Sequence, residues 1–339
     1  MDGDTVFSVA EEFASSHAAT PEQHHLLARA FRGRRNQLRR QARAPDDPDC
    51  IAVPQWVYRA IRDDAAPILA LTVATALLWA GIDLLDDLMD GDLPPEVQGF
   101  VPAEVTLAAI TLITALAPLA LSVVPASPPT IVAMQQTLAQ GLLAMSAGQQ
   151  RDVAMAGSGE VSVAAVEAAV LGKTGAGVAM LAALAAVLAE APEDRVATYA
   201  RMGRALGAAC QLHSDAFDLF SAPVSRDLRN GTRTLPIAWH LERLSGPKRD
   251  RFLALLDRAR LDRSAVDAVR AELMEAGTVQ ACAFTVELYC QEARQALAQA
   301  HAREPAAAAL RRRIEALSFF PAAADASTMR RQKEWNDAV

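Results

Sequence analysis

The chain has 339 residues, 52% of them hydrophobic and 22% charged, so it is long and apolar enough to bury a large core. Its formal net charge of −7 argues against nucleic acid as a partner, because neutralising a phosphate backbone requires a basic surface. Aromatic residues make up only 5%, and alanine and leucine dominate, so almost every periodic segment predicts a helix. We therefore expect an all-α protein.

Residues 1–50 are expected to form a basic extension of helix and loop. An arginine-rich run precedes the turn-rich segment 45–49, a pattern typical of a solvated helix face ahead of a loop. The N-terminus lacks the basic-then-apolar order of a signal peptide. The cysteines are widely spaced and include no Cys-x-x-Cys pair, which indicates reduced thiols in a cytoplasmic protein. They are Cys50, Cys210, Cys282 and Cys290.

Helical periodicity is nearly continuous after Val53, and Pro and Gly residues mark its interruptions. We assign residues 51–320 to one catalytic domain and residues 321–339 to a flexible C-terminal tail. The expected helices span residues 54–63, 65–90, 102–124, 128–155, 160–173, 175–190, 192–221, 233–244, 247–259, 263–275, 277–302 and 304–316.

Aspartates interrupt the end of the apolar segment 65–90. On a helix they lie at i, i+3, i+4 and i+7, so they project from one face: Asp83, Asp86, Asp87 and Asp90. Like charges this close repel one another unless a cation neutralises them, and oxygen-only ligands suit Mg²⁺. The alternative is a solvated acidic helix end before Gly91. The preceding helix is apolar on every side and therefore buried, which favours carboxylates at the mouth of a cavity.

A second predicted helix repeats this pattern. Its polar residues Gln211, Ser214, Asp215 and Asp218 again lie at i, i+3, i+4 and i+7. Two facing helices with such clusters can hold several Mg²⁺ ions that bridge a diphosphate. Lys173 interrupts another apolar helical region, where it either snorkels to the surface or reaches an anion. The two acidic clusters favour the anion.

A stretch without charged residues runs from Glu104 to Arg151 and raises the question of a membrane span. Several prolines break this stretch, and glutamines make one side of it polar. We therefore expect buried helices of a bundle and no membrane span.

The order and spacing of these motifs resemble the trans-isoprenyl diphosphate synthases and class I terpenoid synthases from about residue 54 onward. The resemblance rests on Asp-Asp-x-x-Asp at 86–90, Gly-Gln-x-x-Asp at 148–152, Lys173-Thr174, the second acidic motif and the segment 227–236. It implies a single-domain bundle of about 10–13 mostly antiparallel helices around a deep apolar pocket. It also implies Mg²⁺-assisted ionisation of an allylic prenyl diphosphate, by an enzyme that is usually a homodimer.

The resemblance also assigns roles to individual residues. The residues implied in catalysis are Asp86, Asp87, Asp90 and Lys173. The implied metal ligands are Asp86, Asp90, Ser214, Asp215 and Asp218, and more than one Mg²⁺ is expected. The expected substrate-binding residues are Gly81, Gln149, Asp152, Thr174, Gln211 and Arg233.

Three basic elements of the chain-elongating members are missing. The segments 50–56 and 91–97 carry no cation, and Gly231-Thr232 replaces Gly-Lys, which leaves Arg233 as a substitute. Because a diphosphate is not desolvated without cations, binding of isopentenyl diphosphate in the usual place is not expected. The leading hypothesis is therefore a terpene synthase, a carbon–oxygen lyase that ionises one allylic diphosphate and cyclises the cation. Gly81 is small where bulk would floor the pocket, which predicts a farnesyl, geranylgeranyl or longer substrate.

Two alternatives remain. One is a prenyltransferase that elongates with isopentenyl diphosphate, held by Arg59, Arg62 or Arg233, or that prenylates another acceptor. The other is a non-catalytic subunit of a heteromeric synthase.

Overall fold

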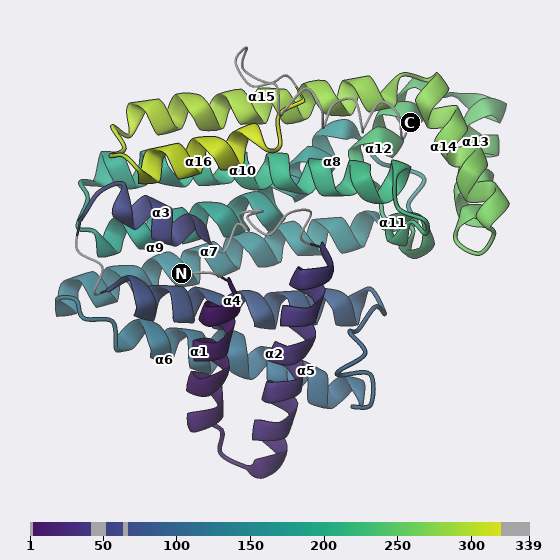
Figure 1. Ribbon diagram of the computed structural model, residues 1–339. Helices are drawn as coiled ribbons and strands as arrows, with labels where there is room; N and C mark the ends of the chain where they lie inside the picture. Colours follow the sequence, from purple (N-terminus) through teal and green to yellow (C-terminus); the bar gives the residue numbers. More distant parts are fainter. Residues whose placement is uncertain (1–2, 42–51, 64–66, 320–339) are drawn as a thin grey trace. The chain divides into compact units, whose positions relative to one another are not determined.

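The computed structural model describes residues 3–41, 52–63 and 67–319 (Figure 1). Within these ranges every regular element is a helix and no strand occurs, which confirms the all-α prediction. The predicted C-terminal tail, 321–339, lies outside the described residues, as does Cys50.

The helices in chain order are α1 (Gly3–Ser16), α2 (Pro21–Gln41), α3 (Val53–Arg59), α4 (Ile68–Met89), α5 (Pro102–Ile110), η2 (Thr111–Leu116), α6 (Ala117–Ser122), α7 (Pro128–Met155), α8 (Val163–Val170), η3 (Leu171–Gly175), α9 (Ala176–Leu188), α10 (Glu193–Phe220), α11 (Arg226–Asn230), α12 (Leu235–Arg243), α13 (Gly246–Ala259), α14 (Arg263–Glu275), α15 (Thr278–Gln299) and α16 (Ala306–Glu315).

Most of these bounds follow the periodicity of the sequence. Helix α14 has the bounds that were predicted, and α7, α10 and α13 differ from the predictions by a residue or less at each end. Two predicted helices, 160–173 and 175–190, are instead one helical stretch, because the π-helical turn η3 joins α8 to α9 without a break. A second π-helical turn, η2, lies between α5 and α6. The short helix α11 was not predicted.

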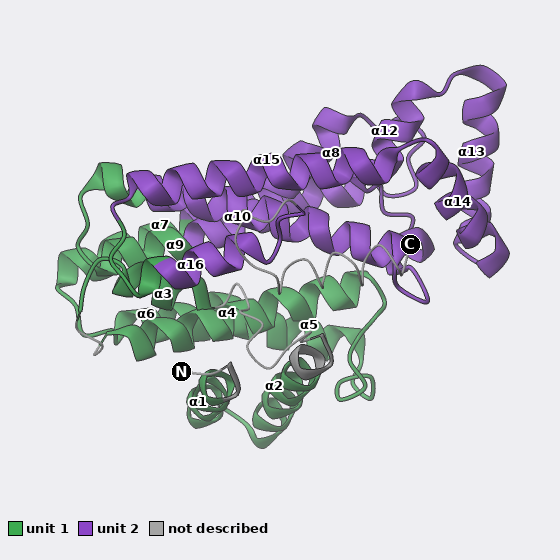
Figure 2. Ribbon diagram, turned by 45° about the horizontal axis from the view of Figure 1, so that its top comes forward, with its two compact units in different colours: residues 1–139, 181–196, 302–307 green, residues 140–180, 197–301, 308–339 purple. Residues whose placement is uncertain are grey.

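The chain forms two compact units (Figure 2), and helices α7, α9, α10 and α16 contribute residues to both. Unit 1 comprises residues 1–139, 181–196 and 302–307. In it, α1 and α2 form an antiparallel hairpin beside α4 (Figure 1). The ring centroids of Phe7 and Phe31, one from each helix of the hairpin, lie 6.5 Å apart. Helix α4 also packs against α3, α5, η2 and α6. Residues 71–78 of this helix are all buried, as its apolar sequence predicts, whereas Leu69 near its start is exposed.

Unit 2 comprises residues 140–180, 197–301 and 308–339. Helices α13 and α14 form a hairpin whose buried face includes Phe252, Val269 and Leu273. Helices α12 and α14 pack on α15, and α8 packs on α12. In α10, small residues such as Gly203, Gly207 and Ala208 are fully packed, which keeps one side of this long helix in the core.

Three helical stretches are long and apolar enough to cross a membrane by length and composition alone: Ile68–Met89, Pro102–Ser122 and Val163–Leu188. Buried residues make up 72%, 44% and 61% of their most apolar windows, so Pro102–Ser122 is the least covered of the three. The expectation that the chain has no membrane span stays a prediction.

Gly81 allows α4 to approach the next helices closely. A Cβ atom at this position would lie 2.7 Å from Ile113 Cγ1, 2.9 Å from Leu112 Cβ and 3.0 Å from the Ala109 carbonyl oxygen. Helix packing therefore explains the glycine, and its role in the choice of substrate length stays a prediction.

We predict that Gly81→Ala lowers the free energy of unfolding by about 2 kcal/mol, because the added methyl group has no space in this packing. Urea unfolding followed by circular dichroism measures the change. Gly99→Ala is the matched control, since a Cβ atom there meets nothing within 4 Å. Equal stabilities of the two variants would contradict the packing argument.

Candidate active site

Helix α10 presents the second acidic motif on one side, in contact with the π-helical turn η3. Thr174 Oγ1 donates to Gln211 Oε1 at 2.5 Å, and Gln211 Nε2 donates to Asp215 Oδ1 at 2.7 Å. The structure thus brings together three residues that the sequence predicted for this site. Their hydrogen-bonded chain fixes the side chain of Asp215 through the amide of Gln211.

Lys173 and Asp152 also meet at this turn, with Lys173 Nζ 3.5 Å from Asp152 Oδ2. Helix α7 and the turn η3 approach through two glycines, since a Cβ atom on Gly148 would lie 2.1 Å from the carbonyl carbon of Gly172. Such π-helical turns are frequent at functional sites. The glycine contact places the Lys173 backbone directly against α7, the helix that carries Asp152.

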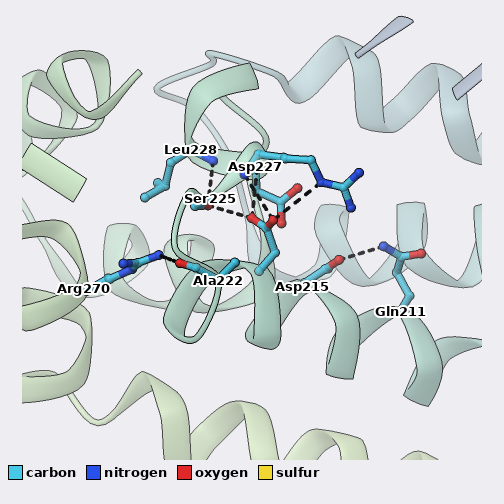
Figure 3. A network of polar contacts seen from close by, with 9 residues as sticks. Gln211, Asp215, Ala222, Ser225, Asp227, Leu228 and Arg270 are labelled. Atoms are coloured by element: carbon cyan, nitrogen blue, oxygen red, sulfur yellow. Dashed lines mark hydrogen bonds and ion pairs between the residues drawn. The ribbon is translucent and has the colours of Figure 1, made fainter. Parts of the chain in front are cut away.

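Asp218 is held by the start of α11 (Figure 3). Its Oδ2 accepts from Ser225 Oγ at 2.7 Å and from the amide of Asp227 at 3.1 Å, and its Oδ1 accepts from the amide of Arg226 at 3.1 Å. Ser225 is also the N-cap of α11, because its Oγ accepts from the amide of Leu228. The carboxylate therefore joins the end of α10 to the beginning of α11 in the described structure.

The C-terminal end of α10 is fixed by Arg270 of α14 (Figure 3). Its Nε and Nη2 each donate at 2.6 Å, to the carbonyl oxygens of Leu219 and Ala222 respectively. Because the last carbonyl groups of a helix have no partner within it, a guanidinium group satisfies them well. Arg270 thus secures the loop that leads to Ser225.

The carboxylates of this site repel one another. Burial, together with the nearby charges of Asp152 and Asp218, raises the pKa of Asp215 to about 7, although Gln211 and Lys173 oppose the rise. Burial also raises the pKa of Asp227 well above its usual value, with Asp215 and Asp218 adding to the effect. Carboxyl groups that share one region without enough positive charge are disfavoured in the ionised form. The site therefore has a deficit of cations.

Asp227 was not assigned a role from the sequence, although it lies in a segment that carried the resemblance. The sequence feature that could have indicated a role is its position in the first turn of α11, two residues after the N-cap Ser225. Of the other predicted residues of this unit, Gln149 is half-buried on α7 and Ser214 is exposed on α10. Their roles in substrate and metal binding stay predictions.

Arg233 lies beside another loop. Its Nε donates to the carbonyl oxygen of Ser158 at 2.8 Å, and burial lowers its pKa against the opposing effect of Asp257. The same loop is tied to Gly231, whose carbonyl oxygen accepts from the amide of Gly157 at 2.9 Å. The observed role of Arg233 is thus to hold this loop, and its predicted role in anion binding stays a prediction.

The first acidic motif lies in unit 1, at the C-terminal end of α4. Asp86 and Asp87 are half-buried, and Asp90 is exposed at the C-cap of the helix. Asp83, on the turn before them, pairs with Arg34 of α2: Arg34 Nε lies 2.8 Å from Asp83 Oδ2. Whether Asp86 and Asp218 face one cavity stays a prediction.

The carboxylates are a suitable donor set for Mg²⁺, which prefers oxygen ligands. Burial, and secondarily the neighbouring carboxylates, raise the pKa values of Asp215 and Asp227, and a bound cation would oppose both effects. Within the described residues, no three His, Cys, Asp or Glu side chains already form a metal-binding group.

A family model described as polyprenyl synthetase matches residues 50–273 of this sequence. The chain belongs to the polyprenyl synthetase family. The matched region contains both acidic motifs, Lys173 and the start of α11, so the family relationship covers the whole polar network of unit 2. No curated protein matches the chain.

Solved structures of polyprenyl synthetases have the same fold. A polyprenyl synthetase from Streptomyces coelicolor is 21% identical with a TM-score of 0.78, and the match covers 93% of this chain and 97% of that one. A geranylgeranyl pyrophosphate synthetase from Pyrococcus horikoshii is 19% identical with a TM-score of 0.75, covering 94% and 99%. A Caulobacter crescentus polyprenyl synthase complexed with calcium and isoprenyl diphosphate is 18% identical with a TM-score of 0.72, covering 93% of each chain. At these identities the similarity shows the fold.

We predict a pH-dependent effect of Asp215→Asn on stability. Because the pKa of Asp215 is raised to about 7, the folded protein holds more protons than the unfolded chain between about pH 4 and pH 7, so this carboxyl group lowers stability as pH rises through that window. The free energy of unfolding of the variant, measured relative to that of the native protein, should therefore rise by about 2–4 kcal/mol from pH 4 to pH 7 and stay constant above pH 7. Urea unfolding in EDTA measures the difference, and a difference independent of pH would contradict the shifted pKa.

Proposed function

We propose that this protein is a Mg²⁺-dependent trans-prenyltransferase that joins an allylic prenyl diphosphate to isopentenyl diphosphate or another acceptor. The observation that carries the proposal is the carboxylate network of α7, α10 and α11 around Lys173, inside a region that matches the polyprenyl synthetase family. This family relationship favours the prenyltransferase over the terpene cyclase, which was the leading expectation from the missing basic residues.

The residues of the site fit the first step of such a reaction. Cleavage of the allylic carbon–oxygen bond leaves a carbocation and a diphosphate, so positive charge must stabilise the departing group. Mg²⁺ would supply much of that charge. The carboxylates that would hold it are Asp215 and Asp218 on α10 and, as a separate set, Asp86 and Asp90 on α4. Lys173 binds the diphosphate directly. Thr174 and Gln211 orient Asp215 through their hydrogen bonds.

The acceptor is the less constrained part of the proposal. Of the arginines considered as substitutes, Arg233 donates to the carbonyl oxygen of Ser158, and Arg62 pairs with Glu190 at 3.7 Å. The segment 91–97 carries no cation. These observations favour a second candidate function, cyclisation of a single allylic diphosphate without a charged co-substrate, and the assay below separates the two.

A partly exposed apolar surface in unit 1 supports a homodimer as the working form. It lies on α5, α6 and the beginning of α7, which include the least covered of the three apolar stretches. Apolar side chains exposed in such number along consecutive segments are typical of interaction surfaces. They are Val101, Leu107, Ile110, Leu119, Val123 and Val132.

The three free cysteines that the structure describes support a cytoplasmic location, because thiols stay reduced there. They are Cys210, Cys282 and Cys290.

The product assay tests the proposed reaction. Geranyl, farnesyl and geranylgeranyl diphosphates are each supplied with Mg²⁺, with and without isopentenyl diphosphate, and the products are identified by mass. We expect longer prenyl diphosphates only when isopentenyl diphosphate is present. Terpene hydrocarbons or alcohols formed without it would replace the transferase with the cyclase.

We predict that Asp86→Ala lowers kcat about a hundredfold or more with the best substrate, because it removes a ligand of the ion that stabilises the leaving group. Asp250→Ala, which removes an exposed carboxylate from α13, is the control and should keep the native rate. If Asp86→Ala keeps its activity, the first acidic motif has no catalytic role. A chain that is inactive alone but supports the activity of a partner regardless of Asp86 would be a structural subunit.

A further inference from the structure

The pairing of α2 with α4 assigns a further role to the N-terminal extension. We propose that Arg34 is a positioning residue that neutralises Asp83 and thereby sets the charge that the first acidic motif presents to Mg²⁺. The inference rests on the proposed function, because it concerns the affinity of this motif for its metal. It also assigns a function to one residue of the arginine-rich segment, for which the sequence alone indicated a solvated helix face.

The ion pair is close and poorly exposed to solvent. Arg34 Nε lies 2.8 Å from Asp83 Oδ2, and the two side chains are only 12% and 26% exposed. Ion pairs on open surfaces are screened by water and salt, whereas pairs with little exposure interact more strongly. Arg34 therefore offsets part of the charge of Asp83 through their proximity, although the two nearest atoms are not in hydrogen-bonding geometry.

The rest of α2 fixes Arg34 in this place. On either side of it, Arg29 Nε donates to the carbonyl oxygen of Glu96 at 2.7 Å, and Asn36 Nδ2 donates to Glu96 Oε1 at 2.6 Å. Between them, Gly33 lies against Pro94, so that a Cβ atom there would approach Pro94 Cγ to 3.1 Å. Helix α2 is thus attached to the segment that directly follows the first acidic motif, and Arg34 is held against α4 from both directions.

The location of Asp83 gives the pair its consequence. Asp83 is one helical turn before Asp86 and Asp87, on the same face of α4, where an uncompensated carboxylate would add to their negative field. With Arg34 in place, the effective acidic group consists of Asp86, Asp87 and Asp90. Removing Arg34 alone should make the electrostatic potential at this group more negative. Removing Asp83 alone should make it less negative.

The test is a charge-balanced mutant cycle. Arg34→Met removes a positive charge next to Asp83, so the concentration of Mg²⁺ that gives half-maximal activity should fall about fivefold. Asp83→Asn removes the negative charge that faces Arg34, so this concentration should rise by a similar factor. The double variant should return to the native value, and Arg34→Lys, which keeps the charge, should stay close to it. Mn²⁺ binding followed by electron paramagnetic resonance replaces the activity measurement for any inactive variant.

A neighbouring pair provides the matched control. Arg35, the next residue of α2, pairs with Glu11 of α1 at 2.5 Å instead of with α4. Arg35→Met removes an equal charge and should leave the Mg²⁺ dependence unchanged, although both variants lower the unfolding temperature.

The outcomes separate the inference from the proposed function. If Arg34→Met and Asp83→Asn shift the Mg²⁺ dependence in the same direction, or not at all, while Asp86→Asn weakens Mg²⁺ binding, then Arg34 is only structural and the inference is overturned. If Asp86→Asn itself leaves Mg²⁺ binding unchanged, the proposed function fails instead. Opposite shifts that cancel in the double variant support the inference.

Discussion

The burial of several carboxylates in one region is the constraint on which the site depends, and their mutual repulsion adds to it. Asp152, Asp215, Asp218 and Asp227 act on one another, and Lys173 compensates only part of their charge. Such a group is costly in the free protein and becomes favourable when cations and an anionic ligand complete it. The deficit of positive charge thus connects the fold of unit 2 with the chemistry of the polyprenyl synthetase family.

The surrounding structure prevents the carboxylates from moving apart. Gln211 fixes Asp215, the start of α11 fixes Asp218, and Arg270 fixes the end of α10 from a different helix. The backbone contact between Gly148 and Gly172 sets the position of the turn that carries Lys173. The contact of Gln211 with Asp215 joins two side chains, whereas the other contacts use backbone groups or small residues, which leave little freedom for the side chains that they position.

Periodicity and spacing were enough to predict most of the helices, although not α11 or the continuity of α8 with α9. Gln211, Asp215 and Asp218 lie on one side of α10 because helical spacing requires it, and the apolar run before Asp83 correctly indicated a buried helix. Contacts between distant segments were not predictable, because a local pattern does not determine which helix packs against which. The pairing of Arg34 with Asp83, the loop contact of Arg233 and the tight packing around Gly81 are of this kind.

Proton release on ligand binding tests the central claim most directly. Mg²⁺ is titrated into the protein with inorganic diphosphate at pH 7, by calorimetry in buffers of different ionisation enthalpy, and the native protein is compared with Asp215→Asn. Because the pKa of Asp215 is about 7 and a bound cation requires the carboxylate, the native protein should release roughly half a proton more than the variant. Equal proton release from the two proteins would contradict a cation-deficient site at Asp215.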